Sequence, residues 1–328
     1  MARWLAVLLL AVGCSSTTSN TPGQPASAKT VRVAFFAPVQ NGFIQATLAG
    51  AKQAAADNGS QVTVFAANGS LTTQQSQIQD ATTSGNYDAF VIFPLAPAIA
   101  PAVVQAIKAG IKVATVEAAI TADPLRPGAL PGQVISTAEP LSDRADGLAQ
   151  MTVEACGTRD PCNVGFLYGI AQNPSDSAIF GAMKAELGKH PNIHIVATGE
   201  GKFAVQPAQA AAADMFQAHP DINVLASNSD DMARGARLAA QSAGLSKVDF
   251  IGVGASVTGC QMVKAGQLFG TTTSVPRTAG HQGALAVIKA VREGSSGLPQ
   301  IWIPLAQMHL SVAITKGNAE SCPAQWGL

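Results

Sequence analysis

The chain has 328 residues, enough to bury more than one core of ordinary size. Its 20 Lys and Arg residues balance its 20 Asp and Glu residues, which argues against a nucleic acid or an acidic lipid surface as a partner. Apolar residues make up 47% of the chain and charged residues 12%, which excludes a disordered protein. Length and composition therefore favour a folded protein of two domains.

Residues 1–13 have the features of an export signal. An apolar stretch from Trp4 to Val12, preceded by a positive residue, leads through Gly13 to Cys14. The stretch is too short to cross a bilayer, which predicts a signal peptide and not a membrane anchor. The segment resembles a lipobox, in which the peptide is cut before a cysteine that is then acylated, although Ala11 stands where Leu is usual. The alternative is ordinary cleavage that leaves Cys14 unmodified.

Residues 14–30 are polar and contain Pro and Gly. Such a segment has too few apolar side chains to pack, so it predicts a flexible tether. We therefore expect an exported lipoprotein that is anchored in the cell membrane and faces the periplasm or the cell exterior.

The other cysteines are even in number, and export permits disulfides. Cys156 and Cys162 enclose the turn-like sequence GTRDP, which favours a bond between them. By elimination Cys260 pairs with Cys322, which would fix the C-terminal tail. A metal site is the alternative, but the sequence has no CxxC and no His cluster at ligand spacing, so we expect no metal.

From residue 31 onward, short β-branched apolar runs alternate with longer Ala-rich stretches. The apolar runs predict strands at Val31–Ala37, Val62–Ala66, Ala89–Phe93, Val113–Glu117, Val134–Ser136, Val164–Tyr168, Ile193–Thr198, Val224–Ser227, Phe250–Gly254 and Gly270–Ser274. Apolar residues at helical spacing predict helices at Phe43–Asp57, Thr73–Ser84, Ala98–Ala109, Leu141–Glu154, Ser177–Leu187, Pro207–Ala218, Asp231–Ser242, Val257–Ala265 and Gly280–Glu293. This alternation is typical of α/β proteins with parallel sheets covered on both faces.

These units are too many for one small open sheet. The strands through Ser136 make one group, and those from Val164 to Ser274 make a second. The late helix and the run Ile301–Leu305 form a further unit. We therefore expect two doubly wound lobes, with a TIM barrel as the alternative architecture.

Five stretches, in order along the chain, carry a resemblance to a known family. They read PVQNGFIQATLAGAKQAAADNG, QQSQIQDATTSGNYDAFVIFPLAPAIAPAVVQAIKAGIKVATVE, VGFLYGIAQNPSDSAIFGAMKAEL, FQAHPDINVLASNSDDMARGARLAAQSAG and FIGVGASVTGCQMVKAGQLFGTTTSVP. On these stretches the chain resembles the type I periplasmic binding proteins, in particular the ribose- and galactose-binding branch that serves sugar ABC importers. The resemblance runs from Val31 to about Lys316.

The resemblance implies that the chain crosses between the lobes three times. It places residues 31–137 and 277–306 in the N-terminal lobe, and residues 138–276 and 307–328 in the C-terminal lobe. Three connecting segments imply hinge closure of the two lobes around a ligand.

Ligands of doubly wound sheets bind outside the carboxyl ends of the strands, so the loops there supply the candidate site. Asn41 and Phe43 match the family's asparagine and aromatic residue after the first strand, which implies a hydrogen-bonding amide and a stacking ring. Their alternative roles are a turn residue and a core phenylalanine. Glu117 ends a strand where the family has Asp followed by Arg, whereas Ala118 follows here. A carboxylate buried without a partner is costly, so we expect Glu117 to bind ligand.

In the second lobe, the resemblance implies that Phe203 is a further ligand-facing ring; the alternative is a core aromatic. Ser229 and Asp230 stand where the family commonly has Asn and Asp, which implies contacts to ligand. Asp230 also suits the first turn of a helix, where the helix dipole favours a carboxylate. Ser274 takes the place of a family glutamine near the second crossing, and we include it in the ligand site.

Several positions depart from the family's polar set. The departures are Ala118, Ala178, Ser229, Gly254 and Ser274. They leave a pocket with fewer polar groups than a pentose site has, compatible with a polyol, a deoxygenated sugar or another small hydroxylated compound.

Catalysis has little support in the sequence. The five histidines are dispersed, no nucleophile has an evident base, and no Gly-rich phosphate loop is present. We therefore expect no enzymatic activity and no cofactor.

The sequence thus predicts the substrate-binding lipoprotein of an ABC importer, which captures a sugar or polyol by hinge closure and then docks on a membrane permease subunit. We expect a monomer. Two alternatives remain open at this point: a ligand-sensing module that acts on a membrane signalling protein, and an importer receptor for a small molecule that is not a carbohydrate.

Overall fold

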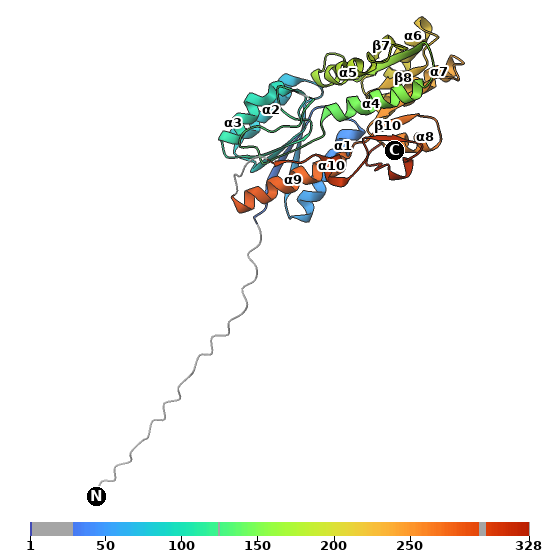
Figure 1. Cartoon of the computed structure of the whole chain (residues 1–328). Helices are drawn as coiled ribbons and strands as arrows, with labels where there is room; N and C mark the ends of the chain where they lie inside the picture. Colours follow the sequence, from blue (N-terminus) through green and yellow to red (C-terminus); the bar gives the residue numbers. More distant parts are fainter. Residues whose placement is uncertain (2–28, 124, 295–299, 328) are drawn as a thin grey trace.

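The computed structural model describes Met1 and residues 29–123, 125–294 and 300–327. It consists of two lobes, each with a six-stranded sheet between helices (Figure 1). Cys14, the predicted signal peptide after Met1 and all but the last two residues of the predicted tether lie outside the described residues. Two open sheets exclude the TIM barrel and confirm the predicted fold class.

The first sheet has the strand order β11-β5-β4-β3-β1-β2, and every neighbouring pair is parallel. Its strands are β1 (Arg32–Ala37), β2 (Gln61–Ala66), β3 (Ala89–Ile92), β4 (Lys112–Glu117), β5 (Ile135–Ala138) and β11 (Gln300–Ile301). Its helices are α1 (Gly42–Asp57), α2 (Leu71–Ser84), η1 (Pro97–Ile99), α3 (Ala100–Lys108) and α9 (Pro276–Glu293).

The side chains of β1 show how this sheet is covered on both faces. Val33 and Phe35 join a core beneath α1 and α9, while Ala34 and Phe36 join a separate core beneath α2 and α3. Because successive side chains of a strand point to opposite faces, a continuous apolar run fills both cores.

Helices α1 and α9 lie side by side although more than two hundred residues separate them in the chain (Figure 1). They approach most closely at Gly50 and Gly280. A Cβ at Gly50 would lie 1.9 Å from the Arg277 carbonyl oxygen, and one at Gly280 would lie 1.9 Å from that of Thr47. Glycine at these two positions therefore permits the contact that returns the late helix to the first lobe.

The second sheet has the order β12-β10-β9-β8-β6-β7 and is parallel except for the pair β10 and β12. Its strands are β6 (Cys162–Tyr168), β7 (Ile193–Glu200), β8 (Val224–Ser227), β9 (Asp249–Val253), β10 (Gly270–Thr272) and β12 (Ala313–Thr315). Its helices are α4 (Leu141–Cys156), α5 (Pro174–Leu187), α6 (Val205–Ala218), α7 (Asp230–Ser242), α8 (Val257–Lys264) and η2 (Ala319–Ser321).

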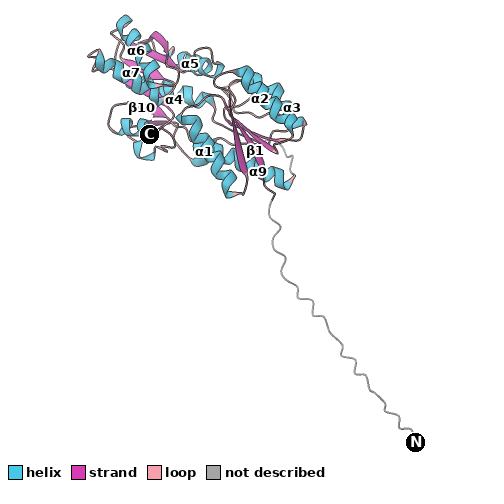
Figure 2. Ribbon diagram, turned by 180° about the vertical axis from the view of Figure 1, so that it is seen from behind, coloured by secondary structure: helices cyan, strands magenta, loops and turns pink. Residues whose placement is uncertain are grey.

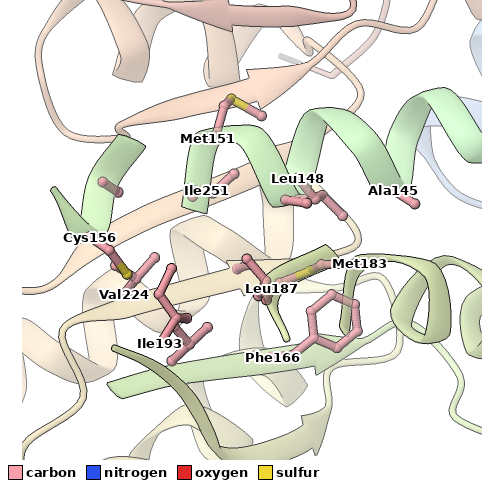
Figure 3. Close-up of a cluster of buried hydrophobic side chains, with 14 of the residues drawn as sticks. Ala145, Leu148, Met151, Cys156, Phe166, Met183, Leu187, Ile193, Val224 and Ile251 are labelled. Atoms are coloured by element: carbon pink, nitrogen blue, oxygen red, sulfur yellow. The ribbon is translucent and has the colours of Figure 1, made fainter. Parts of the chain in front are cut away.

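This sheet also separates two cores. Figure 3 shows the one beneath α4 and α5, where Leu148, Phe166 and Met183 meet. The other lies beneath α6 and α7 and contains Leu225 and Met232. Figure 2 shows the same two-lobed arrangement from behind.

The chain passes between the two sheets three times. The passages follow β5, follow β10, and run from β11 through α10 (Pro304–Met308) to β12. Three connecting segments permit the lobes to rotate relative to one another about one hinge region.

Element boundaries differ from the sequence prediction at a few places. The strand predicted to end at Ser274 ends at Thr272, and the unit predicted at Ile301–Leu305 is a short strand followed by α10, which begins at Pro304. Proline suits the first turn of a helix, since it lacks the N–H that would otherwise have no partner there. Strand β12 was not predicted, because three residues carry too little periodicity to recognise.

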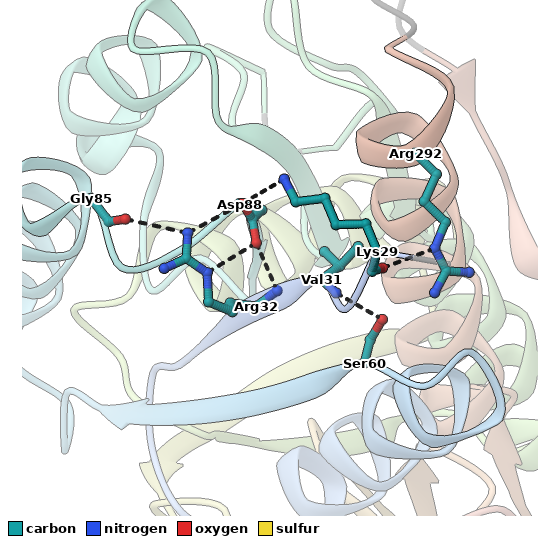
Figure 4. Close-up of polar contacts among 7 residues, drawn as sticks. All are labelled: Lys29, Val31, Arg32, Ser60, Gly85, Asp88 and Arg292. Carbon is teal, nitrogen blue, oxygen red and sulfur yellow. Dashed lines mark hydrogen bonds and ion pairs between the residues drawn. The ribbon is translucent and has the colours of Figure 1, made fainter. Parts of the chain in front are cut away.

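The amino end of β1 is fixed by a polar cluster at the edge opposite the loops that follow the strands (Figure 4). Asp88 accepts hydrogen bonds from the Arg32 backbone and guanidinium and from Lys29. Although partial burial acts to raise the pKa of Asp88, these hydrogen bonds lower it to about 2. The cluster therefore anchors the start of the described domain far from the carboxyl ends of the strands.

Disulfides join Cys156 to Cys162 and Cys260 to Cys322. The first bridges α4 and β6, and the second connects α8 to the C-terminal tail. Among the described residues, no helix is both long and apolar enough to cross a membrane.

Candidate functional site

A cavity of about 160 Å³ lies between the lobes, at the carboxyl ends of strands from both sheets. The first lobe contributes the loops after β1, β3 and β4, and the second lobe contributes those after β6, β7, β8 and β9. In each sheet this edge includes the point where the strand order reverses, between β1 and β3 and between β6 and β8. The cavity thus occupies the usual ligand position of two doubly wound sheets at once.

Asn41 and Phe43 both line the cavity. Asn41 also caps α1, because its side-chain oxygen accepts a hydrogen bond from the Ile44 backbone at 2.9 Å. The Phe43 ring packs edge-to-face against Phe93, another lining residue, with 6.3 Å between ring centroids. Asn41 therefore caps the helix and also lines the cavity. Phe43 forms part of an aromatic wall.

Glu117 ends β4 and lines the cavity with only 2% of its surface exposed. Its φ of 64° is a left-handed backbone conformation, which a non-glycine residue adopts at a cost of about 1–3 kcal/mol. Neither of its carboxylate oxygens has a hydrogen-bond partner among the described residues. A strained, buried carboxylate that accepts no hydrogen bond from the described residues is suited, at a cavity wall, to accept hydrogen bonds from a ligand.

Arg144 reaches the same place from the first turn of α4, in the other lobe. Its Nη2 atom lies 3.7 Å from Glu117 Oε2 and 3.8 Å from Glu139 Oε2. Its guanidinium carbon is also 6.0 Å from the centroid of the Phe43 ring. Arg144 therefore contacts the first lobe with both its charge and its planar face.

The two carboxylates share this one cation. Burial and the nearby Glu139 raise the pKa of Glu117, to about 8, although Arg144 acts to lower it. Burial likewise raises the pKa of Glu139, to about 7, against the effect of Arg144. Because one Arg compensates only one negative charge, the pair binds a proton more readily than two exposed carboxylates do.

The second lobe offers a polar network at the ends of β6 and β8. Asp176 Oδ2 accepts a hydrogen bond from the Ile170 backbone at 2.6 Å, and Asp176 Oδ1 accepts one from the Asn228 side-chain amide. Burial raises the pKa of Asp176 to about 6 in spite of these hydrogen bonds. The carbonyl oxygen of Asn228 has no partner among the described residues, so the network still offers an acceptor at the cavity.

Ser229 lines the cavity and caps α7, since its Oγ accepts a hydrogen bond from the Asp231 backbone at 3.2 Å. Asp230 is not among the lining residues. Its carboxylate accepts hydrogen bonds from the Ser256 backbone at 2.7 Å and from the Thr271 hydroxyl at 2.6 Å. Asp231 is the lining carboxylate of this loop.

Phe203 lines the cavity from the loop after β7, with a φ of 53°. Its ring lies against Gly169, where a Cβ would be 1.9 Å from the ring. Ser274 lies in the second crossing, away from the lining. Its hydroxyl is 3.4 Å from Arg144 Nη2 and 3.5 Å from Glu139 Oε2. Ser274 therefore contacts the polar side chains between the lobes and does not line the cavity.

Sequence reasoning missed several lining residues, which are Phe93, Arg144, Asp176, Asn228, Asp231 and Trp326. Asn228 and Asp231 flank the predicted site residues Ser229 and Asp230. Their position at the end of a strand could therefore have indicated them. Arg144 lies in α4, the helix that follows the first passage between the lobes, and Trp326 lies in the C-terminal tail. No signal in the sequence places either residue at the ends of the strands.

The model of the family "Periplasmic binding protein domain" matches residues 33–295. The chain is 25% identical over 315 residues to a xylitol-binding protein of Mycolicibacterium smegmatis, covering 94% of this chain and 84% of that protein.

Two solved structures are similar in fold. One is an ABC transporter solute-binding protein from Mycobacterium smegmatis with bound glycerol, with a TM-score of 0.75, 24% identity, and coverage of 89% of this chain and 96% of that chain. The other is an ABC transporter periplasmic solute-binding protein from Actinobacillus succinogenes with bound D-allose, with a TM-score of 0.76, 21% identity, and coverage of 89% and 99%. These likenesses confirm the fold expected from the sequence.

Proposed function

From the premise that this chain belongs to the periplasmic binding protein domain family, a family of binding proteins, we propose that it is the solute-binding subunit of an ABC importer. It captures a small hydroxylated solute, a sugar or a polyol, in the cavity between its lobes.

The observation that carries the proposal is the pairing of acceptors across the cavity. Glu117 of the first lobe and Asn228 of the second each present a buried oxygen that accepts no hydrogen bond from the described residues. A solute with several hydroxyl groups donates to both at once. Because only the closed form makes both contacts, the solute stabilises closure.

The size of the cavity limits the solute. A volume of about 160 Å³ is below the range of about 300–1,000 Å³ that is usual for drug-sized ligands, which favours a small solute. A monosaccharide or a polyol is of this kind, whereas an oligosaccharide is larger. Xylitol, glycerol and D-allose, the ligands of the similar proteins, are all small solutes.

The lining also favours a solute with both hydroxyl and C–H faces. Aromatic rings at Phe43, Phe93 and Phe203 cover apolar surface, and the polar atoms are few. Carbohydrates and polyols present both kinds of surface.

The proposal includes export and membrane attachment. Residues 1–13 serve as the signal peptide, and Cys14 carries the lipid that holds the protein near its permease. Mass spectrometry of the membrane-extracted protein tests this. We expect an N-terminal diacylglyceryl cysteine at position 14, and a C14S variant should appear in the soluble fraction. An unmodified Cys14 in a membrane-free protein contradicts the anchor.

The solute assignment is tested by calorimetric titration of the full chain with xylitol, D-allose, myo-inositol, D-ribose and D-galactose, beside amino acids and nucleosides. We expect at least one polyol or sugar to bind. The Glu117→Ala variant should then bind about 100-fold more weakly, because it removes the carboxylate to which the solute hydroxyls donate.

The matched control is Glu154→Ala, on an exposed part of α4. It should bind like the unaltered chain. Binding of amino acids or nucleosides alone would contradict the carbohydrate assignment, and equal affinity of the Glu117 variant would contradict the site.

A further inference from the structure

The C-terminal tail, residues 322–327, reaches the cavity and fills part of its wall. It begins at the disulfide between Cys322 and Cys260 of α8. Trp326 donates its indole N–H to the Gly254 carbonyl at 2.5 Å, and its own carbonyl accepts a hydrogen bond from the Val257 backbone at 2.7 Å. Three attachments therefore hold the tail on the second lobe.

The same tail also contacts the first lobe. The Trp326 ring packs edge-to-face against Phe43, with 5.3 Å between centroids. Gln325 exchanges two hydrogen bonds with Thr278 of α9, accepting from its backbone N–H at 3.0 Å and donating to its hydroxyl at 2.7 Å. The tail therefore connects the lobes in addition to the three passages of the chain.

Gly254 makes the position of the indole possible. Its φ is 115°, and a Cβ there would lie 2.5 Å from Trp326 Cζ2. A side chain at position 254 and the tail tryptophan would therefore occupy the same space, so glycine at this position permits the tail to reach the cavity.

We propose that the C-terminal tail is a clasp that binds both lobes, and that its Trp326 contacts the solute. The proposal rests on the solute-binding function above and deepens it. An indole covers C–H groups and offers no lone pair to hydroxyls, so the clasp selects solutes that lack a hydroxyl on that side, such as deoxy sugars.

Affinity and selectivity test the solute contact. Trp326→Ala in the full chain should weaken binding of the tightest panel member about tenfold. Gly254→Asp should displace the indole and shift the preference from deoxy sugars toward the corresponding fully hydroxylated sugars. Trp302→Phe, a half-buried tryptophan outside the cavity lining, is the control and should bind within twofold of the unaltered chain.

Amide hydrogen exchange of the ligand-free protein tests the clasp independently of any solute. The backbone N–H groups of Thr278 and Val257 donate to the tail from opposite lobes. A chain that ends at Cys322 should exchange at least tenfold faster at both amides. Gln325→Ala should accelerate Thr278 alone.

The outcomes separate the two proposals. If no sugar or polyol binds the unaltered chain, the proposed function fails, while the exchange at Thr278 and Val257 still decides the clasp. If a polyol binds and the Trp326 variant binds equally well, the solute contact is overturned. Unchanged exchange at Thr278 in the shortened chain overturns the clasp.

Discussion

The two walls of the cavity differ in chemistry. The first lobe presents Phe43, Phe93 and apolar neighbours around one carboxylate, Glu117, whereas the second lobe presents the network of Asp176 and Asn228 beside its own rings, Phe203 and Trp326. Hydrogen bonds have direction and apolar contacts do not, so we expect the polar wall of the second lobe to select the configuration of a solute and the aromatic wall of the first to add affinity without much selection.

The largest effect should follow from a change in the polar wall. Asp176→Asn removes the charge that holds the Asn228 amide and the Ile170 backbone N–H, so the network loses its orientation. We expect about 100-fold weaker binding and a narrower spread of affinities among epimeric sugars, measured by calorimetry. The control Asp80→Asn, exposed on α2, should change neither quantity. Retained discrimination among epimers would place selectivity elsewhere.

A change in the aromatic wall should have a smaller and less selective effect. Phe43→Leu keeps an apolar side chain but removes the ring beside Arg144 and Trp326. We expect about tenfold weaker binding of every panel member, with their relative order unchanged. The comparison of the walls would be wrong if this variant reordered the panel.

The carboxylates at the hinge should make stability depend on pH. Since burial raises the folded pKa of Glu117 and Glu139 above the ordinary value, the folded state binds more protons than the unfolded state between about pH 5 and pH 8. Stability is therefore present at low pH and is lost as pH rises, by about 1 kcal/mol per pH unit. Urea unfolding at pH 6, 7 and 8 measures the slope.

The variant Glu139→Gln should flatten that slope, and the exposed Glu154→Gln should leave it unchanged. Burial also raises the pKa values of Asp176 and Asp230, to about 6, so these groups lower stability in the same way as pH rises, but at lower pH. The slope above pH 6 therefore reports mainly on Glu117 and Glu139. A flat profile above pH 6 would show that both carboxylates are fully compensated, since a carboxyl group with an ordinary or lowered pKa is ionised in both states there.

The smallest effect should come from Ser274. Its hydroxyl contacts Arg144 and Glu139 and does not line the cavity. Ser274→Ala should therefore change solute affinity by less than threefold in the same titrations. A loss as large as that of the Phe43 variant would mean that Ser274 acts directly on the solute.

The sequence by itself determined the architecture and part of the site. Alternation of apolar runs with helical stretches follows from local chemistry, because each strand of a parallel sheet is buried on both faces. The ends of strands are visible in such a pattern. Of the seven residues predicted there to bind ligand, five line the cavity, namely Asn41, Phe43, Glu117, Phe203 and Ser229. The sequence also contains the cysteines whose pairing fixes the tail.

Only the tertiary structure decided which residues meet across the lobes. Arg144 lies in α4 and Trp326 in the C-terminal tail. Neither position has a periodic signal that relates it to Glu117 or Phe43, which these side chains contact. The tertiary structure also decided that Asp230 bonds to Thr271 and Ser274 contacts Glu139, so that neither lines the cavity. Asp231 lines the cavity instead. Contacts of this kind depend on how distant segments pack, whereas a local pattern reports only the element in which a residue lies.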